Sequence, residues 1–316
     1  MELILHHYDS SPFSEKIRLI LGWKGLDWQS VTVPSILPKP DVVALTGGYR
    51  KTPFLQIGSH IYCDTALICD VLEHLRAEPA LYPVRHKGLA RVVAQWADER
   101  LFWAAMSYNF QPKGVAQVFG GGAPEQWGPI AKAFGEDRAR MRTAVPRAPA
   151  PDATAAYRSY LRRLSDMLHA QPYLLGDTPC LADFSAYHPL WFTRTQTPAL
   201  AGIFEAVPAV QDWMARMAAI GHGRSVSLDA AAAIARCAAS PDSGAVLPAQ
   251  PFQDEHGIPL GSRVSIISDS FGPEPSSGEL VAATRMHYTL RRVDPRAGVV
   301  HVHFPRIGYI LKKEET

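Results

Sequence analysis

The sequence predicts an α/β domain at the N-terminus, an all-helical domain after it and a small all-β module at the C-terminus. Three observations support this fold class. Short apolar runs alternate with amphipathic helix patterns over residues 1–80, helical periodicity dominates residues 86–240, and residues 245–316 are rich in Val, Ile, Thr and Tyr between turn signals. These ranges are the expected domains, and 316 residues suffice for two or three of them.

Composition narrows the functional class. The net charge of +2 gives no reason to propose nucleic acid or an acidic membrane as a partner. The four cysteines form no Cys-x-x-Cys pattern, which indicates reduced thiols. The N-terminus has too few apolar residues for a signal peptide, and no uncharged apolar run approaches the roughly 20 residues of a membrane span. We therefore expect a soluble cytoplasmic protein.

The first helix begins in a way that favours an anion. Residues 3–5 are apolar, and a helix follows with Ser11 as its N-cap and Pro12 in its first turn. Ile17 and Ile20 belong to the apolar face of this helix. A capped helix directly after a strand presents free N–H groups and the positive end of the helix dipole.

Residues 8–18 resemble the first turn of the thioredoxin fold, where a Cys-Pro-x-Cys motif begins the first helix. Ser11 and Ser14 stand at the two cysteine positions here. Such a site has no thiol for disulfide exchange, but its helix start can stabilise a thiolate that a ligand brings. Glutathione is the ligand that the resemblance suggests.

A second segment strengthens this resemblance. Residues 48–58 indicate a basic loop followed by a strand, and Asp64 and Thr65 begin an amphipathic helix. The order of these elements resembles the thioredoxin-like N-terminal domain of cytosolic glutathione S-transferases, with a serine or omega-like motif at the first helix.

The resemblance implies a glutathione site. In that family the residue before a cis-proline pairs its backbone with the cysteinyl part of glutathione, and an acidic–hydroxyl pair holds the γ-glutamyl end. The matching positions are Thr52 before Pro53, and Asp64 with Thr65. Asp64 can accept from the γ-glutamyl ammonium while N–H groups of the helix start hold the carboxylate. The other glutathione-binding candidates are Phe13, Arg50 and Lys51, the last two for the glycyl carboxylate.

Several hydroxyls are candidates for stabilising the thiolate. Ser11 is preferred because its spacing to Arg18 resembles the omega-like pattern. Ser10, Ser14 and Tyr8 are the alternatives. Lowering a thiol pKa from about 8.5 by about two units requires roughly 2.7 kcal/mol of preference for the thiolate. A hydrogen bond to a charged acceptor contributes about 1.5–3 kcal/mol and a helix terminus roughly 0.3–1 kcal/mol, so no metal is needed.

The helical region resembles the second domain of glutathione S-transferases. Residues 174–185 match its buried helix start, with Asp183 present and Cys180 at the cap position. A thiol is a weak acceptor, so we expect this helix start to be less well satisfied than in the family. The resemblance also implies an electrophile pocket near the end of the first long helix. Its candidates are Trp103, Tyr108 and Phe110.

Beyond residue 245 the chain extends past an ordinary glutathione S-transferase. Strand-forming runs at 263–267, 279–293 and 298–311 suggest a small barrel or half-barrel of unknown role. We expect a separately packed unit that docks on the helical domain and is dispensable for glutathione binding. Three histidines of these strands could bind a metal, but they lack a carboxylate or thiol at fixed spacing, so we expect no metal site. They are His287, His301 and His303.

Together these observations predict a glutathione S-transferase-like enzyme that uses glutathione as co-substrate and a small hydrophobic electrophile as substrate. Two alternatives stay open: a non-catalytic glutathione-binding or scaffold protein, and a glutathione-dependent isomerase or ether-cleaving enzyme. The presence of Thr52, Pro53 and Asp64 favours glutathione chemistry over a scaffold. A homodimer is compatible with the resemblance, and the sequence leaves the electrophile unidentified.

Overall fold

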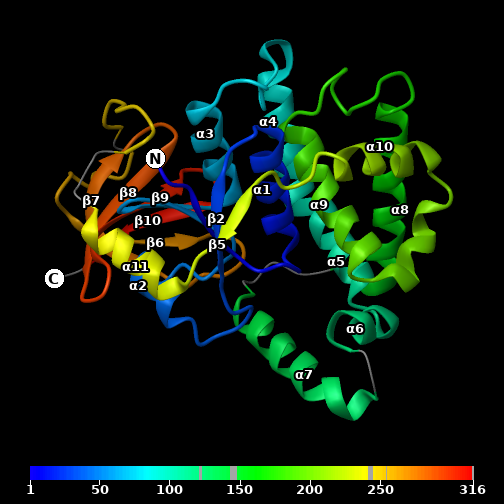
Figure 1. Ribbon diagram of the computed structural model, residues 1–316, viewed down its shortest axis with the longest axis horizontal. Helices are drawn as coiled ribbons and strands as arrows, with labels where there is room; N and C mark the ends of the chain where they lie inside the picture. The colour runs from blue at the N-terminus through cyan, green and yellow to red at the C-terminus, as the bar shows by residue number, and fades with distance from the viewer. Residues whose placement is uncertain (121–122, 143–147, 241–244, 254, 315–316) are drawn as a thin grey trace.

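The structure, a computed structural model, describes residues 1–120, 123–142, 148–240, 245–253 and 255–314. Figure 1 shows a mixed α/β part, a group of helices beside it, and strands in the C-terminal part. The strands are β1 (Ile4–His7), β2 (Trp28–Thr32), β3 (Phe54–Ile57), β4 (His60–Cys63), β5 (Ser225–Ser227), β6 (Arg263–Ser268), β7 (Ser276–Ala283), β8 (His287–Asp294), β9 (Gly298–Pro305) and β10 (Tyr309–Lys313). The helices are α1 (Pro12–Trp23), α2 (Pro40–Thr46), α3 (Thr65–Leu75), α4 (Lys87–Trp96), α5 (Phe102–Asn109), α6 (Pro112–Phe119), α7 (Pro124–Arg140), α8 (Ala150–Met167), α9 (Leu181–Thr195), α10 (Pro208–Ala218) and α11 (Ala230–Ala239).

The N-terminal part has the thioredoxin-like order that the sequence predicts. β1 pairs parallel to β2 and antiparallel to β3, and β3 pairs antiparallel to β4. At the start of α1, the Ser11 hydroxyl oxygen accepts from the Ser14 N–H at 3.2 Å. At the start of α3, a carboxylate oxygen of Asp64 accepts from the Ala66 N–H at 3.0 Å. Both caps satisfy N–H groups that have no partner within the helix.

The helical part runs from α4 to α10. A π-helical turn, Ala97–Leu101, joins α4 to α5, where the sequence predicts one continuous helix. Two further helices, α6 and α7, follow Phe110. Most of α7 is exposed, so little apolar periodicity marks it, and Figure 1 shows it extending away from the other helices. Residues 121–122 and 143–147 lie outside the described residues.

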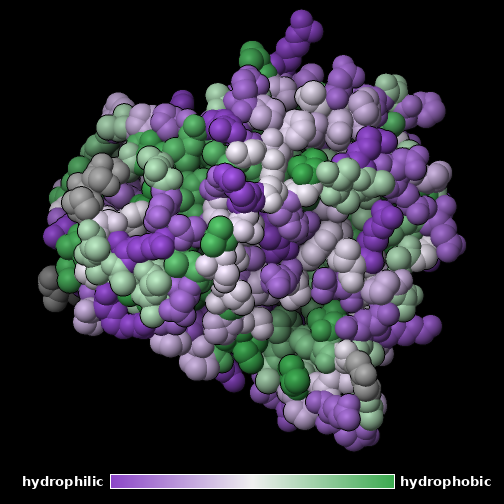
Figure 2. All heavy atoms as spheres, in the orientation of Figure 1, coloured by the Kyte–Doolittle hydropathy of each residue, from purple (hydrophilic) through white to green (hydrophobic). Residues whose placement is uncertain are grey.

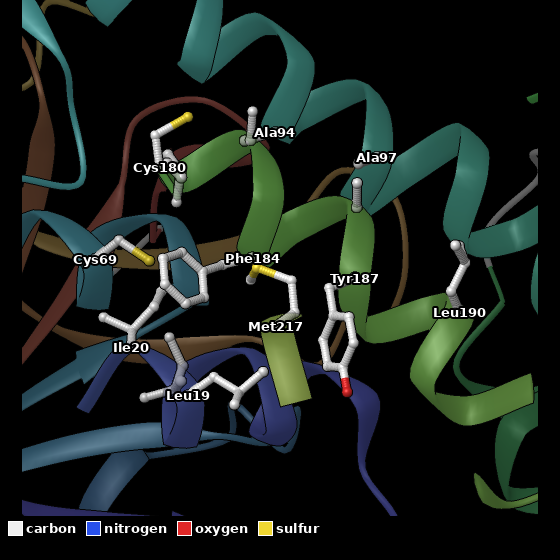
Figure 3. Close-up of a cluster of buried hydrophobic side chains, with 14 of the residues drawn as sticks. Leu19, Ile20, Cys69, Ala94, Ala97, Cys180, Phe184, Tyr187, Leu190 and Met217 are labelled. Carbon is white, nitrogen blue, oxygen red and sulfur yellow. The ribbon is translucent and has the colours of Figure 1, made fainter. Parts of the chain in front are cut away.

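One hydrophobic core joins the thioredoxin-like part to the helices. Figure 3 shows Phe184 of α9 beside Ile20 of α1 and Cys69 of α3. All three side chains are fully buried. Ala94 and Ala97 belong to the same core, and their small side chains let the chain around them approach α9 closely. The site at the start of α1 is therefore built on an element that both parts hold in place.

The C-terminal strands extend the thioredoxin-like sheet. β9 pairs parallel to β4, with His60 opposite His301 and Tyr62 opposite His303. The strand order is β10-β6-β7-β8-β9-β4-β3-β1-β2-β5. The expectation of a separate unit docked on the helical domain is wrong. Without β9, the outer side of β4 would be a sheet edge whose N–H and C=O groups need partners, and β9 supplies them.

The added strands share a second core with the N-terminal part. This core includes Phe54 of β3 and Ile61 of β4 together with Val302 and Phe304 of β9. Side chains of α2 and α11 complete it, and Figure 1 shows these helices next to each other beside the strands. The added strands thus bury their apolar face against the N-terminal domain.

The sheet curls so that its edge strand β10 returns to the start of α3. β6, β7, β8 and β9 separate β10 from β4 in the strand order, yet the Tyr309 hydroxyl of β10 donates to Asp64 at 2.9 Å. This curvature agrees with the half-barrel form.

The predicted run at 279–293 is interrupted between β7 and β8, because residues 284–286 make the turn between them. The predicted domain ranges stay predictions, and residues 241–244 at one boundary lie outside the described residues.

Hydrophilic residues cover most of the helical side of the face in Figure 2, and hydrophobic residues gather over the C-terminal strands and beside α7. Over the ranges that the structure describes, no helix combines the length and the apolar character that crossing a membrane requires.

Candidate functional site

Three chain segments meet at one end of the sheet. His6 of β1 lies opposite Phe54 of β3, and Phe54 lies opposite Cys63 of β4. Since both pairings are antiparallel, the residues after β1, before β3 and after β4 lie at the same end. The three segments that the sequence predicts as one site are therefore neighbours.

The start of α1 and the residue before Pro53 carry buried hydroxyls. Ser11 is 2% exposed, and its oxygen caps the helix, which leaves its hydroxyl hydrogen for another acceptor. The hydroxyls of Ser14 and Thr52 are buried and have no hydrogen-bond partner within the described residues. Buried hydroxyls without a partner are uncommon, so these two fit a polar ligand at this place. Ser10, the neighbouring candidate, is half-buried.

The turn between β1 and α1 is held by a buried arginine. Arg18 donates to the backbone oxygens of Tyr8 and Asp9 at 3.4 and 3.0 Å, and it forms an ion pair with Glu15. The Tyr8 hydroxyl accepts from Arg138 of α7 at 3.4 Å. The candidate hydroxyls thus differ in surroundings, because Ser11 lies at the helix start and Tyr8 contacts α7.

Asp64 is fixed by contacts on both its backbone and its side chain. Its N–H donates to the Tyr49 hydroxyl at 3.1 Å, and its φ of 74° is uncommon for a residue other than glycine. One carboxylate oxygen caps α3, and the other accepts from Tyr309. The Thr52–Pro53 peptide bond nearby is cis. The Asp64 side chain remains 29% exposed, so part of the carboxylate faces outward.

Thr65 is linked to a buried ion pair. Lys16 of α1 donates to the Thr65 hydroxyl at 3.2 Å and to Asp98 at 2.7 Å. His188 of α9 contacts the other Asp98 oxygen at 3.0 Å. Burial disfavours both charges, but the attraction between them prevails, raising the pKa of Lys16 and lowering the pKa of Asp98. The π-helical turn that carries Asp98 thus ties α1 and the start of α3 to the helical part.

The two cations predicted to bind a carboxylate already have partners in this chain. Arg50 is buried, and it forms ion pairs with Asp137 of α7 at 2.8 Å and with Glu274, between β6 and β7, at 2.5 Å. Lys51 donates to the Ser268 hydroxyl of β6 at 3.1 Å. A ligand carboxylate would have to exchange with these groups to contact either cation.

Two of the aromatic candidates border the site. The Phe13 ring lies 4.7 Å from Phe102 and 4.6 Å from His188, between centroids, and therefore faces the helical part. Trp103 contacts Phe271, between β6 and β7, with their centroids 5.2 Å apart. Trp103 is therefore beside the C-terminal segment that also contains Glu274.

The other two aromatic candidates pack among helices. The Tyr108 hydroxyl donates to the Leu200 backbone oxygen at 2.9 Å, while Phe110 stacks on Phe134 and Phe192 with centroids 6.0 Å apart in each pair. Their contacts are those of helix packing, and their role in an electrophile pocket stays a prediction.

The histidines of the C-terminal strands gather where β9 joins β4. His303 is hydrogen-bonded to His60 at 2.9 Å and to the Thr289 hydroxyl at 2.9 Å, and His301 stacks on His60. Burial, and then the neighbouring imidazoles, lower the pKa of His303 well below its usual range. In the described part of the chain, no three His, Cys, Asp or Glu side chains are arranged to hold a metal.

Sequence reasoning missed the residues that the C-terminal strands contribute. Ser268 is 217 positions from Lys51, and Tyr309 is 245 positions from Asp64, so no local pattern connects them.

A lysine before the basic loop, Lys39, was also missed. Its ammonium donates to the Arg50 backbone oxygen at 3.1 Å, and burial lowers its pKa to about 8. Lys39 lies outside the basic loop that the sequence indicates at residues 48–58, and no pattern in the sequence marked it.

Comparisons with known proteins agree on one family. The model of the glutathione S-transferase N-terminal domain matches residues 5–80, and that of the C-terminal domain matches residues 124–216. A GST-like protein from Pseudomonas syringae, known from its crystal structure, is 41% identical to this chain in sequence. The similarity covers 99% of each chain, and the two structures superpose with a TM-score of 0.79. The C-terminal strands thus fall within the similarity to that protein.

Two curated relatives are more distant. FtsZ-localized protein A of Caulobacter vibrioides is 25% identical over 192 residues, which cover 59% of this chain and 75% of that protein. A probable maleylacetoacetate isomerase 1 of Drosophila melanogaster is 35% identical over 86 residues, which cover 25% of this chain and 35% of that protein.

Proposed function

The chain belongs to the glutathione S-transferase superfamily, and on this premise we propose that it binds glutathione and activates the glutathione thiol for attack on a small electrophile. The observation that carries the proposal is the meeting of three segments at one end of the sheet: the start of α1, the residue before Pro53 and the start of α3. Each segment offers a group that matches one part of glutathione.

The γ-glutamyl end would lie at the start of α3. The partly exposed Asp64 carboxylate accepts from the ammonium, and Thr65 with the N–H groups of the helix start holds the carboxylate. The backbone of Thr52 would pair with the cysteinyl part. Arg50 and Lys51 remain the proposed contacts of the glycyl carboxylate, after exchange with their present partners.

The thiol would lie at the N-terminus of α1. The Ser11 hydroxyl donates to the thiolate, and the N–H groups of the helix start add their partial positive charge. The thiolate sulfur forms a bond to the electrophilic carbon, and the leaving group departs with its electron pair. The thiol proton goes to solvent. Phe13 and Trp103 are the proposed neighbours of the electrophile.

A non-catalytic protein, glutathione-binding or scaffold, is the second candidate. Ser11 is 2% exposed, which limits the access of a thiolate to its hydroxyl. Arg50 and Lys51, the proposed glycyl contacts, are paired within the chain, which favours the scaffold form. One relative is named for its localisation with FtsZ and not for a reaction. Another relative is named a probable isomerase, so glutathione-dependent isomerisation is a further outcome of the same site. Cysteines without disulfides favour a cytoplasmic location. Membership of the family favours a homodimer.

Retention on immobilised glutathione and conjugation of a generic chloroaromatic test this proposal. Asp64→Asn keeps the oxygen that caps α3 but removes the charge, so we expect affinity for glutathione to fall about 10- to 150-fold. Asp229→Asn is the matched control, because Asp229 caps the exposed start of α11 in the same way. Retention without conjugation would favour the binding protein. No retention of the wild type would overturn the proposal.

A further inference from the structure

The C-terminal strand β10 helps to enclose a lysine ammonium beside Asp64. The Lys51 nitrogen lies 4.8 Å from the centroid of the Tyr309 ring and 5.4 Å from that of the Tyr49 ring. It also lies 4.0 Å from a carboxylate oxygen of Asp64 and donates to Ser268 of β6. The two rings and the carboxylate are called the ammonium cage below.

The groups of the cage suit a primary ammonium. Aromatic rings attract a cation through their negative faces, and a carboxylate adds full charge and a hydrogen-bond acceptor. Both tyrosines are neutral, since burial raises the pKa of Tyr49 and of Tyr309 well above the usual range. The Tyr309 hydroxyl donates to Asp64 and holds the carboxylate at the cage. Lys51 therefore shows which kind of ligand group this cage accommodates.

We propose that the ammonium cage of Tyr49, Tyr309 and Asp64 binds the free α-ammonium of a γ-glutamyl thiol, and that Lys51 occupies the cage when no ligand is bound. The inference rests on the proposed function and adds to it a specificity-determining residue from outside the two transferase domains. It also names Lys51 as an internal competitor of the ligand.

Exchange between the two ammonium groups is sterically reasonable. The Lys51 side chain is 20% exposed and the Asp64 side chain 29% exposed, so the cage opens to solvent. Lysine has a long flexible stem, which lets its ammonium move outward when another cation enters. Two cations in one cage would repel each other, so occupancy by Lys51 lowers the affinity for the ligand's ammonium.

The test compares glutathione with its desamino analogue, glutaryl-cysteinyl-glycine, which lacks only the α-ammonium. Isothermal titration gives the ratio of the two affinities for each full-length variant. Lys51→Met removes the competitor, and we expect the ratio to rise about threefold or more. Any contact between Lys51 and the glycyl carboxylate affects both ligands equally and leaves the ratio unchanged. Tyr309→Leu removes one wall, and we expect the ratio to fall by a similar factor.

Two control variants match these changes. Lys312→Met alters an exposed lysine of β10, and Tyr288→Phe alters a buried tyrosine of β8 that pairs with Arg306. Both should keep the wild-type ratio. If Tyr309→Leu fails to fold, the Lys51→Met variant still tests the inference, because the Lys51 side chain is partly exposed and its replacement disturbs the core less.

The outcomes separate the inference from the proposed function. Wild-type protein that binds both ligands equally well would overturn the inference alone, as would a ratio that neither variant changes. Wild-type protein that binds neither ligand would overturn the proposed function and the inference with it.

Discussion

At the N-terminus of α1, two serines occupy the positions of the thioredoxin cysteines and use their hydroxyls differently. Ser11 accepts from the Ser14 N–H and still has a hydrogen to donate, whereas the Ser14 hydroxyl is buried and has no partner within the described residues. Ser11 meets the requirement for a thiolate donor at the helix start. The neighbouring Ser14 hydroxyl can also donate a hydrogen bond to a ligand. The Tyr8 hydroxyl already accepts a hydrogen bond from Arg138. The preference for Ser11 therefore stays a prediction for mutagenesis.

The four cysteines provide a residue-level prediction. All are free and buried, and burial raises the pKa of Cys69 and of Cys180 to about 12 and that of Cys237 to about 11. Since the thiolate is the reactive form, we expect slow labelling in the native protein and rapid labelling of four thiols in denaturant. Mass spectrometry after alkylation without reductant measures this. A two-proton deficit that maps to Cys63 and Cys69 would instead indicate a disulfide and a redox role.

Among the elements, the joint between β4 and β9 decides how the C-terminal strands attach. His60 and His301 face each other across this parallel pair, and His303 is hydrogen-bonded to His60. At least one imidazole of the His60–His303 pair must be neutral, because one nitrogen accepts while the other donates. Burial lowers the pKa of His303 and of His287, so the joint prefers unprotonated histidines.

This joint should make stability depend on pH. A histidine with a lowered pKa binds fewer protons in the folded chain than in the unfolded chain, so the free energy of unfolding falls as pH drops below 6.5. His6 of β1 lies outside this joint, and burial lowers its pKa to about 4. The free energy of unfolding therefore keeps falling until the pH reaches about that value. We expect His303→Gln to make the fall shallower. Urea unfolding at about pH 7 and about pH 5 measures the difference, and equal falls in both proteins would show that His303 does not contribute.

At the scale of the whole molecule, the C-terminal strands belong to the N-terminal domain. They continue its sheet from β4 and share its core through Val302 and Phe304. They also bring Tyr309 and Glu274 to the candidate site. The expectation that this module can be removed without loss of glutathione binding stays a prediction, and these contacts argue against it.

A chain that ends at Ser240 tests this view of the molecule. Removing the strands exposes the apolar residues Phe54 and Ile61 and leaves the edge of β4 without partners. We expect the shortened chain to unfold at a lower temperature than the full chain or to aggregate, while the full chain unfolds cooperatively. Circular dichroism during heating measures both. A shortened chain with the melting temperature of the full chain would show that the strands are an independent unit.

Local patterns were sufficient to predict some features and insufficient for others. The starts of α1, α3 and α9 follow from caps and apolar periodicity that lie within a few residues of each other. The bounds of α7 left little signal, because little of it is buried. The attachment of β9 to β4 was missed because strand pairing across 241 positions leaves no local signal. At the site, Asp64 could be predicted from its cap position, whereas its contact with Tyr309 required the fold.

The central claim is that the start of α1 stabilises a glutathione thiolate. The most direct measurement is the ultraviolet absorbance of the bound thiolate against pH, in wild type and in Ser11→Ala, Ser10→Ala and Tyr8→Phe. In the wild type we expect ionisation about two pH units below the value of about 8.5 for a free thiol, and in Ser11→Ala a shift back toward that value. A shift in Tyr8→Phe but not in Ser11→Ala would identify the other hydroxyl. Bound glutathione that ionises like free glutathione in the wild type would contradict the claim.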